Sequence, residues 1–83
     1  GPNRPPQYDK SKGLTFEQAV ARVKAGGDVV AINQGWAYEI AKAAGNGAEP
    51  ILDPPHKPKP QYWPHYHPGP KHKVGDPHIW WER

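Results

Sequence analysis

Hydrophobic residues in the first half of this chain follow a helical period. Four of them recur one to four residues apart on one helical face, namely Phe16, Ala19, Val20 and Val23. Thr15 precedes the run and belongs to the residue types that cap helix N-termini, and Gly26 and Gly27 follow it and favour helix termination. The pattern predicts an amphipathic helix over residues 15–25.

A short strand and a second helix are predicted next. Residues 28–32, DVVAI, are apolar after Asp28 and contain several β-branched side chains, which is typical of a strand. Residues 35–44 return to a helical pattern, with Asn33 or Gln34 as the cap and residues 45–47, GNG, as a left-handed stop. The inner face of this helix is one of two sets: Trp36, Ile40 and Ala44, or Ala37, Ala41 and Ala44.

Proline changes the pattern in the second half. Nine of the twelve prolines lie between Pro50 and Pro77, which excludes a helix of ordinary length there. Candidate strands cover residues 49–52, 61–67 and 78–82, and a polyproline II recognition segment over 54–70 is the alternative. Trp80 and Trp81 must place one ring on each face of a strand, so we expect one in the core and the other at the surface or an interface.

These elements predict an α+β fold with two N-terminal helices packed on a small three- to four-stranded antiparallel sheet. At 83 residues the chain has room for one small domain with a thin stability margin. We assign residues 14–83 to that domain and residues 1–13, which are polar and lack periodicity, to a flexible linker or tag remnant. Because the chain opens with Gly-Pro and no Met, we expect a fragment of a longer protein.

Composition narrows the available chemistry. The absence of cysteine excludes disulfides, thiolate zinc sites and a cysteine nucleophile. Eleven Lys and Arg against eight Asp and Glu give a net charge of +3, which favours an anionic partner mildly. No apolar run approaches the roughly 18 residues of a membrane span, so no membrane partner is expected.

All five histidines lie in the last 28 residues, and two of them, His65 and His67, stand two residues apart in the segment YWPHYHPGP. On an extended backbone, side chains at positions i and i+2 leave on the same face, so both imidazoles should point into one site. We expect neither to carry the hydrophobic core. One use of such a pair is acid and base catalysis without a metal.

The chain has the parts for metal-free cleavage of a phosphodiester. One imidazole can take the proton of a ribose 2′-hydroxyl while a second protonates the leaving oxygen. Lys71 and Lys73 could stabilise charge on the phosphate, and Trp63, Tyr66 and Trp80 could stack an unpaired base. His72, between the two lysines, is expected to be solvated.

Metal binding is the competing hypothesis for the same histidines. His65 and His67 with either His56 or His78 could supply three imidazoles to zinc. No carboxylate falls at tight spacing within the cluster, and prolines on both sides restrict the rings, so we predict no metal site and no cofactor. Exposed, solvated histidines are the third possibility.

The order of these segments resembles the small C-terminal toxin domains of bacterial polymorphic toxins of the contact-dependent inhibition and RHS type. The similarity is carried by DVVAINQGWAYEIAKAAGNGAEPI, then YWPHYHPGPK and a terminal PHIWW, and it covers about residues 14–83. Such domains are often grouped with the barnase, EndoU, colicin and RelE class of ribonucleases. The resemblance implies a secreted antibacterial ribonuclease that acts without metal in the cytoplasm of the target bacterium.

The resemblance also implies site residues and partners. The catalytic candidates are His65, His67 and His78, and the candidates for RNA or phosphate contact are His56, Tyr66, Lys71, Lys73 and Trp80. RNA, with tRNA among the candidates, is the implied substrate, and an acidic immunity protein is the implied partner. Members of this class often use an arginine or threonine at the site, whereas the last arginine before the terminal Arg83 is Arg22, so a lysine must stand in. The alternatives are a non-enzymatic Pro- and aromatic-rich binding module and a metal-dependent nuclease.

Overall fold

The computed structural model describes residues 13–53 and 64–81 of the chain. This part contains two helices and four short strands. In chain order they are α1 (Phe16–Lys24), β1 (Val29–Ala31), α2 (Gln34–Ala44), β2 (Ile51–Asp53), β3 (His65–His67) and β4 (Ile79–Trp81). Within those residues no helix has the length and apolar character needed to cross a membrane. The α+β class and the order helix, strand, helix, strands are confirmed.

The predicted cap of α1 is present as a capping box. The Gln18 backbone N–H donates to Thr15 Oγ1 at 3.1 Å, and the Thr15 backbone N–H donates to Gln18 Oε1 at 2.9 Å. Two otherwise unpaired donors of the first turn are thereby satisfied. The helix buries Ala19 and Val23, as its period predicted.

The second helix begins and ends as predicted, but its buried face combines residues of both predicted sets. Asn33 caps α2 by accepting from the Trp36 backbone N–H at 2.9 Å. Beyond its end, Asn46 has φ 57° and Gly47 has φ 93°, the left-handed conformation that stops a helix. Ala37 and Ala41 are buried with Ile40, whereas Trp36 is 47% exposed and contacts Phe16 at the edge of the core.

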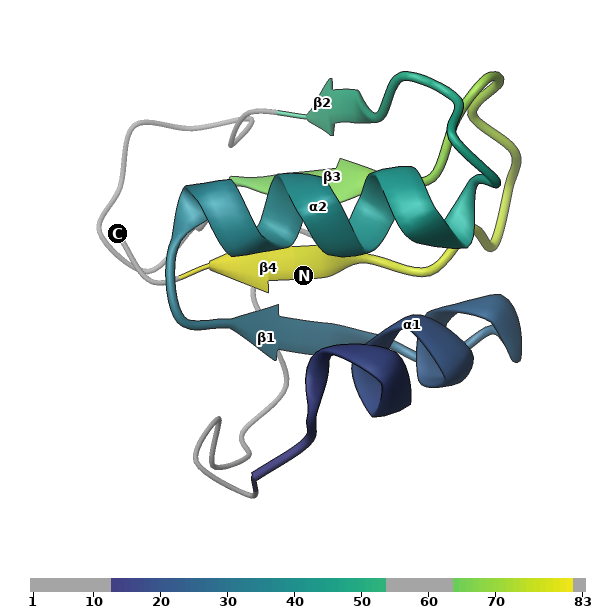
Figure 1. The fold of residues 1–83 in the computed structure, drawn as a ribbon. Coiled ribbons are helices and arrows are strands. Elements are labelled where there is room, and N and C mark those ends of the chain that lie inside the picture. Colours follow the sequence, from purple (N-terminus) through teal and green to yellow (C-terminus); the bar gives the residue numbers. More distant parts are fainter. Residues whose placement is uncertain (1–12, 54–63, 82–83) are drawn as a thin grey trace.

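The sheet is mixed, so the prediction of a purely antiparallel sheet is wrong. The strand order is β1-β4-β3-β2, in which β2–β3 and β3–β4 are antiparallel and β1–β4 is parallel. Helix α2 lies between β1 and β2 in the chain, so the helices do not both precede the sheet. Because α2 carries the chain back before β2 begins, and two reversals follow, β4 runs in the same direction as β1 (Figure 1).

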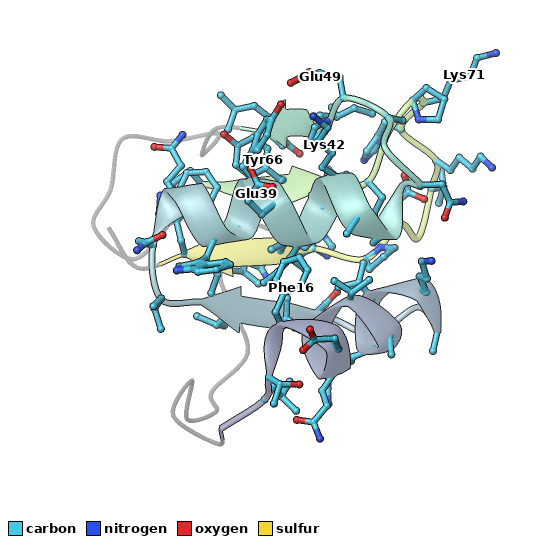
Figure 2. All side chains as sticks on the ribbon, viewed as in Figure 1. Phe16, Glu39, Lys42, Glu49, Tyr66 and Lys71 are labelled. Carbon is cyan, nitrogen blue, oxygen red and sulfur yellow. The ribbon has the colours of Figure 1, made fainter. Side chains whose placement is uncertain are left out.

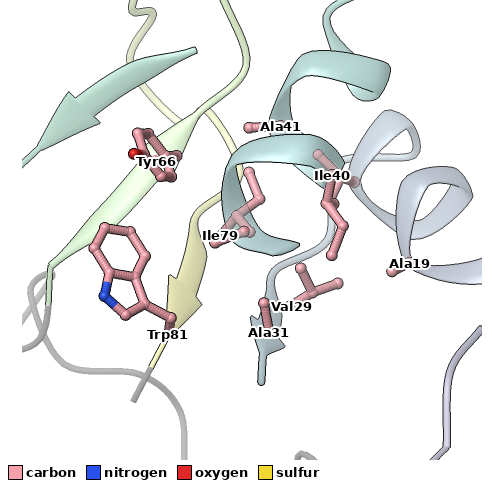
Figure 3. Close-up of a cluster of buried hydrophobic side chains, with 10 residues drawn as sticks. Ala19, Val29, Ala31, Ile40, Ala41, Tyr66, Ile79 and Trp81 are labelled. Atoms are coloured by element: carbon pink, nitrogen blue, oxygen red, sulfur yellow. The ribbon is translucent and has the colours of Figure 1, made fainter. Parts of the chain in front are cut away.

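Both helices cover the same face of the sheet, and alternate strand positions fill the space between (Figure 1). The core cluster includes Val29 and Ala31 of β1, Tyr66 of β3, and Ile79 and Trp81 of β4, packed against Ile40 and Ala41 of α2 (Figure 3). The intervening strand residues must point to the other face, which the described helices leave uncovered. We call that other face, with His65, His67, His78 and Trp80, the imidazole face.

Ile79 is the residue on which the core depends most directly, because it is fully buried at the centre of the sheet. We expect Ile79→Ala to lower the free energy of unfolding by about 2–5 kcal/mol through lost burial and a residual cavity. Leu52→Ala is the matched control, since Leu52 is 51% exposed on the outer strand β2 and should cost about 0.5 kcal/mol or less. Urea unfolding of both variants measures the difference, and equal losses would contradict this view of the core.

Candidate functional site

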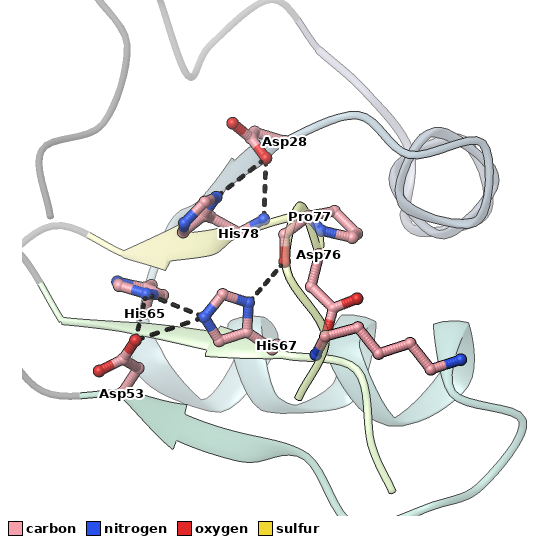
Figure 4. A network of polar contacts seen from close by, with 8 residues as sticks. Asp28, Asp53, His65, His67, Asp76, Pro77 and His78 are labelled. Atoms are coloured by element: carbon pink, nitrogen blue, oxygen red, sulfur yellow. Dashed lines mark hydrogen bonds and ion pairs between the residues drawn. The ribbon is translucent and has the colours of Figure 1, made fainter. Parts of the chain in front are cut away.

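A cluster of imidazoles lies on the imidazole face, where β3 and β4 run side by side (Figure 4). The ring centroids of His65 and His67 are 4.8 Å apart, and each is within 4.9 Å of the His78 ring. Asp53 ends β2 directly opposite His65 in the strand register. The prediction that His65 and His67 share one face is confirmed, and His78 joins them from the position just before β4.

The ring nitrogens of His65 and His67 face each other and a carboxylate. His65 Nε2 lies 3.1 Å from His67 Nε2 and 3.1 Å from Asp53 Oδ2, and His67 Nε2 lies 3.4 Å from the same oxygen. On its other side, His67 Nδ1 lies 3.0 Å from the carbonyl oxygen of Pro77. A carbonyl can only accept, so Nδ1 of His67 carries a proton and donates it to Pro77.

That hydrogen bond fixes the tautomers of both rings. A neutral His67 that is protonated at Nδ1 has a bare lone pair at Nε2, directed at His65. The Nε2–H of His65 is then the donor, shared between His67 Nε2 and Asp53 Oδ2. His65 Nδ1 carries no proton in this tautomer, and it finds no hydrogen-bond partner among the described residues.

Burial keeps this pair of imidazoles neutral. The side chains of His65 and His67 are 1% and 2% exposed, and their removal from water lowers both pKa values, that of His65 to about 4. The nearby His78 ring lowers the pKa of His65 further, whereas Asp53 opposes the shift. Both side chains are among the largest fully buried ones, although neither belongs to the hydrophobic core cluster.

His78 is more accessible and has an orienting partner. Asp28, just before β1, accepts from the His78 backbone N–H at 2.8 Å, and its same oxygen lies 3.3 Å from His78 Nδ1. A carboxylate beside Nδ1 favours the tautomer with the proton there and leaves Nε2 as an acceptor. The ring stacks on Trp80 at 5.1 Å between centroids and 11° between planes, and the side chain remains 26% exposed.

His72 reaches the cluster from the exposed loop after β3. Its ring centroid lies 4.4 Å from that of His67, on the exposed side of the cluster. His72 is exposed, as expected, but its ring also contacts that of His67. The loop is held at its far end by the Lys73 backbone N–H, which donates to Asp76 Oδ2 at 2.6 Å.

The other predicted site residues are placed differently. Tyr66 points to the helix face, where its hydroxyl accepts from Gln34 Nε2 at 3.2 Å, so the sheet separates it from the imidazoles and its assignment to RNA stacking there is corrected. Trp80 and Trp81 lie on opposite faces of the sheet, as predicted, but they are 1% and 8% exposed, so neither ring is exposed at the surface. Lys71 is exposed and points away from the sheet (Figure 2), and His56 lies outside the described residues.

Three members of the site were not identified from the sequence, namely Asp28, Asp53 and His72. Asp53 is twelve residues from His65 in the chain, and Asp28 is fifty residues from His78. No local spacing reveals such pairs, because strand pairing brings them together. His72 was visible only as a histidine in a cationic loop.

The same atoms are of the types that ligate metals. One set of three, within 4.8 Å of one another, comprises ring nitrogens of His65, His67 and His78, and a second comprises Asp53, His67 and His72. Imidazole and carboxylate donors suit zinc and related transition metals. The cluster can therefore act in two ways, as hydrogen-bonded acids and bases or as ligands.

Comparisons of the chain with protein-family models, with curated protein sequences and with solved structures found no match in any of the three. The interpretation of the site accordingly depends on its own geometry.

The lowered pKa values predict that acid destabilises the domain. His65 has a pKa of about 4 in the folded chain against about 6.5 unfolded, so the unfolded chain takes up protons that the folded chain excludes. The free energy of unfolding should fall as pH is lowered from about 7, by up to about 1.4 kcal/mol per pH unit for each such histidine. Urea unfolding across this range, with a chelator present, measures the slope. His65→Asn should flatten it, and constant wild-type stability down to about pH 5 would contradict the assignment.

Proposed function

We propose that this domain is an endoribonuclease, of the kind that ends bacterial polymorphic toxins, and that it cleaves RNA at the histidine cluster. The observation that carries the proposal is that two accessible imidazoles, those of His72 and His78, both contact the ring of the buried His67. They come from a loop and a strand end, and one of them is oriented by a carboxylate. Two independently held imidazoles are what acid and base catalysis on a phosphodiester requires.

His78 is the residue that we assign as the general base. With its Nδ1–H donating to Asp28, its Nε2 has a free lone pair that can take the proton of a ribose 2′-hydroxyl. Asp28 stabilises the imidazolium that this step forms and holds the ring in place, as the carboxylate does in a catalytic triad. The backbone bond from His78 to the same Asp28 oxygen fixes the pair from a second direction.

His72 is the residue that we assign as the general acid. It is exposed beside His67, where it can protonate the 5′-oxygen as that oxygen leaves. Attack by the 2′-oxygen forms its bond to phosphorus as the bond to the 5′-oxygen breaks, which leaves a 2′,3′-cyclic phosphate and a 5′-hydroxyl. His65 and His67 have almost no exposed surface, so in this proposal they position the accessible rings and do not contact RNA.

The basic loop supplies the charge that an anionic substrate needs. Lys73 follows His72 directly, whereas Lys71 points away from the sheet, so Lys73 is the stronger candidate for phosphate contact (Figure 2). Such a cationic edge also suits an acidic immunity protein, because complementary charge speeds association and selects the partner. In this proposal the domain is delivered into a target bacterium and acts on RNA in the cytoplasm of that cell.

His78→Gln should reduce cleavage of a single-stranded RNA oligonucleotide by about 10²–10⁴-fold, which is the usual contribution of an acid or base. The glutamine retains a polar, exposed side chain, so circular dichroism should remain that of the wild type. Lys42→Gln is the control, since Lys42 lies on α2, which covers the opposite face of the sheet (Figure 2). Mass spectrometry of the wild-type products should find 2′,3′-cyclic phosphate ends.

Two results would overturn the proposal in different ways. Products with 3′-hydroxyl ends would exclude attack by the 2′-hydroxyl and indicate an activated water. No cleavage of total RNA, together with normal growth of bacteria that express the domain alone, would reject the nuclease and favour the binding module.

A further inference from the structure

Three side-chain atoms of the cluster lie within hydrogen-bond distance of one another. His65 Nε2, His67 Nε2 and Asp53 Oδ2 are separated by 3.1, 3.1 and 3.4 Å, which makes them a nearly equilateral triangle (Figure 4). Ligands about 2.0–2.1 Å from a tetrahedral zinc ion are about 3.3–3.4 Å from one another. The triangle therefore has the size of one face of a zinc coordination tetrahedron. We propose that Asp53, His65 and His67 bind one divalent metal ion of the zinc type.

Hydrogen bonds alone do not fully satisfy these three atoms. In the tautomer fixed by the Pro77 carbonyl, the triangle holds a single proton, on Nε2 of His65. That N–H must be shared between two acceptors, His67 Nε2 and Asp53 Oδ2. A shared proton satisfies each acceptor less well than a linear bond does. A cation at the centre of the triangle interacts with both imidazole lone pairs and the carboxylate oxygen at once, after His65 moves its proton to Nδ1.

The surroundings of His67 are those of a metal ligand. Ligating histidines almost always donate their second ring N–H to a carboxylate, a carbonyl or water, which fixes the ring and the tautomer. His67 Nδ1 makes that bond to the Pro77 carbonyl oxygen at 3.0 Å. The lone pair of its Nε2 is thus directed at the triangle before any ion arrives, and burial of both imidazoles keeps water from competing with it.

Two more accessible imidazoles lie close to the three proposed ligands. His78 offers a ring nitrogen within 4.8 Å of those of His65 and His67, and His72 does so for Asp53 and His67. Three protein ligands with a fourth position for an imidazole, water or an anion describe the zinc sites that bind substrate. The proposed site goes beyond the ribonuclease function and does not depend on it, because metal binding is measured without RNA.

The test is a metal titration of the folded chain after removal of metals with a chelator. We expect one Zn²⁺ per chain, measured by competition with a chromophoric chelator, and the visible absorption of tetrahedral Co²⁺ when cobalt is used as the probe. Zinc should also raise the unfolding temperature, because it binds the folded chain preferentially. Loss of an outer-sphere partner costs roughly 10–100-fold in metal affinity, so loss of a ligand in Asp53→Asn or His67→Asn should cost at least that much.

Asp53→Asn is the decisive variant, because Asp53 is 31% exposed and its amide replacement keeps the shape of the side chain. Glu39→Gln is the control, since it removes the same charge from the exposed surface of α2 (Figure 2) and should leave zinc affinity unchanged. If His67→Asn does not fold, the comparison of Asp53→Asn with Glu39→Gln decides alone. Zinc affinity equal in wild type and Asp53→Asn, or no tetrahedral cobalt spectrum, would overturn the proposal. Cleavage of RNA without zinc binding would reject the metal site alone, and zinc binding without cleavage would reject the ribonuclease alone.

Discussion

The antiparallel pairing of β3 with β4 is the constraint on which the rest of the structure depends. His65 pairs with Trp80 and Tyr66 with Ile79, so alternate side chains of both strands sort onto opposite faces together. One face supplies apolar groups to the helices, and the other gathers imidazoles. A shift of one residue in this register would bring imidazoles against α2 and expose the core residues, so the fold and the site depend on the same pairing.

The cluster is also part of the interior of the domain. The apolar core contains several alanines and few large aliphatic side chains, and His65 and His67 are buried as completely as Ile79. Buried polar groups are tolerated when they are hydrogen-bonded, and here Asp53 and the Pro77 carbonyl supply the bonds. The function of the site and the stability of the domain are therefore coupled. A His-to-Ala change here would alter both, so amide replacements are the more informative probes.

The four imidazoles of the cluster divide into a buried pair and an accessible pair, and the two pairs suit different roles. The buried pair, His65 and His67, has lowered pKa values and fixed tautomers, so it is suited to hold a cation or a shared proton and poorly suited to meet a polymer. The accessible pair, His72 and His78, has the surface that a substrate requires. His67 contacts both of the accessible rings, so an ion bound to it would place a positive charge close to the proposed acid and to the proposed base.

The sequence by itself determined the features that depend on residues close together in the chain. Capping residues, helical periods and the left-handed stop defined both helices, the prolines excluded helices after Pro50, and the two-residue spacing placed His65 and His67 on one face. Tertiary structure decided which strands became neighbours, because pairing depends on how α2 packs and where the chain reverses. This strand pairing makes β4 parallel to β1 and brings Asp53 to His65 and Asp28 to His78. It also places Tyr66 on the face away from the imidazoles. Contacts between residues twelve to fifty positions apart have no local signal, so the two carboxylates of the site became visible only in the folded chain.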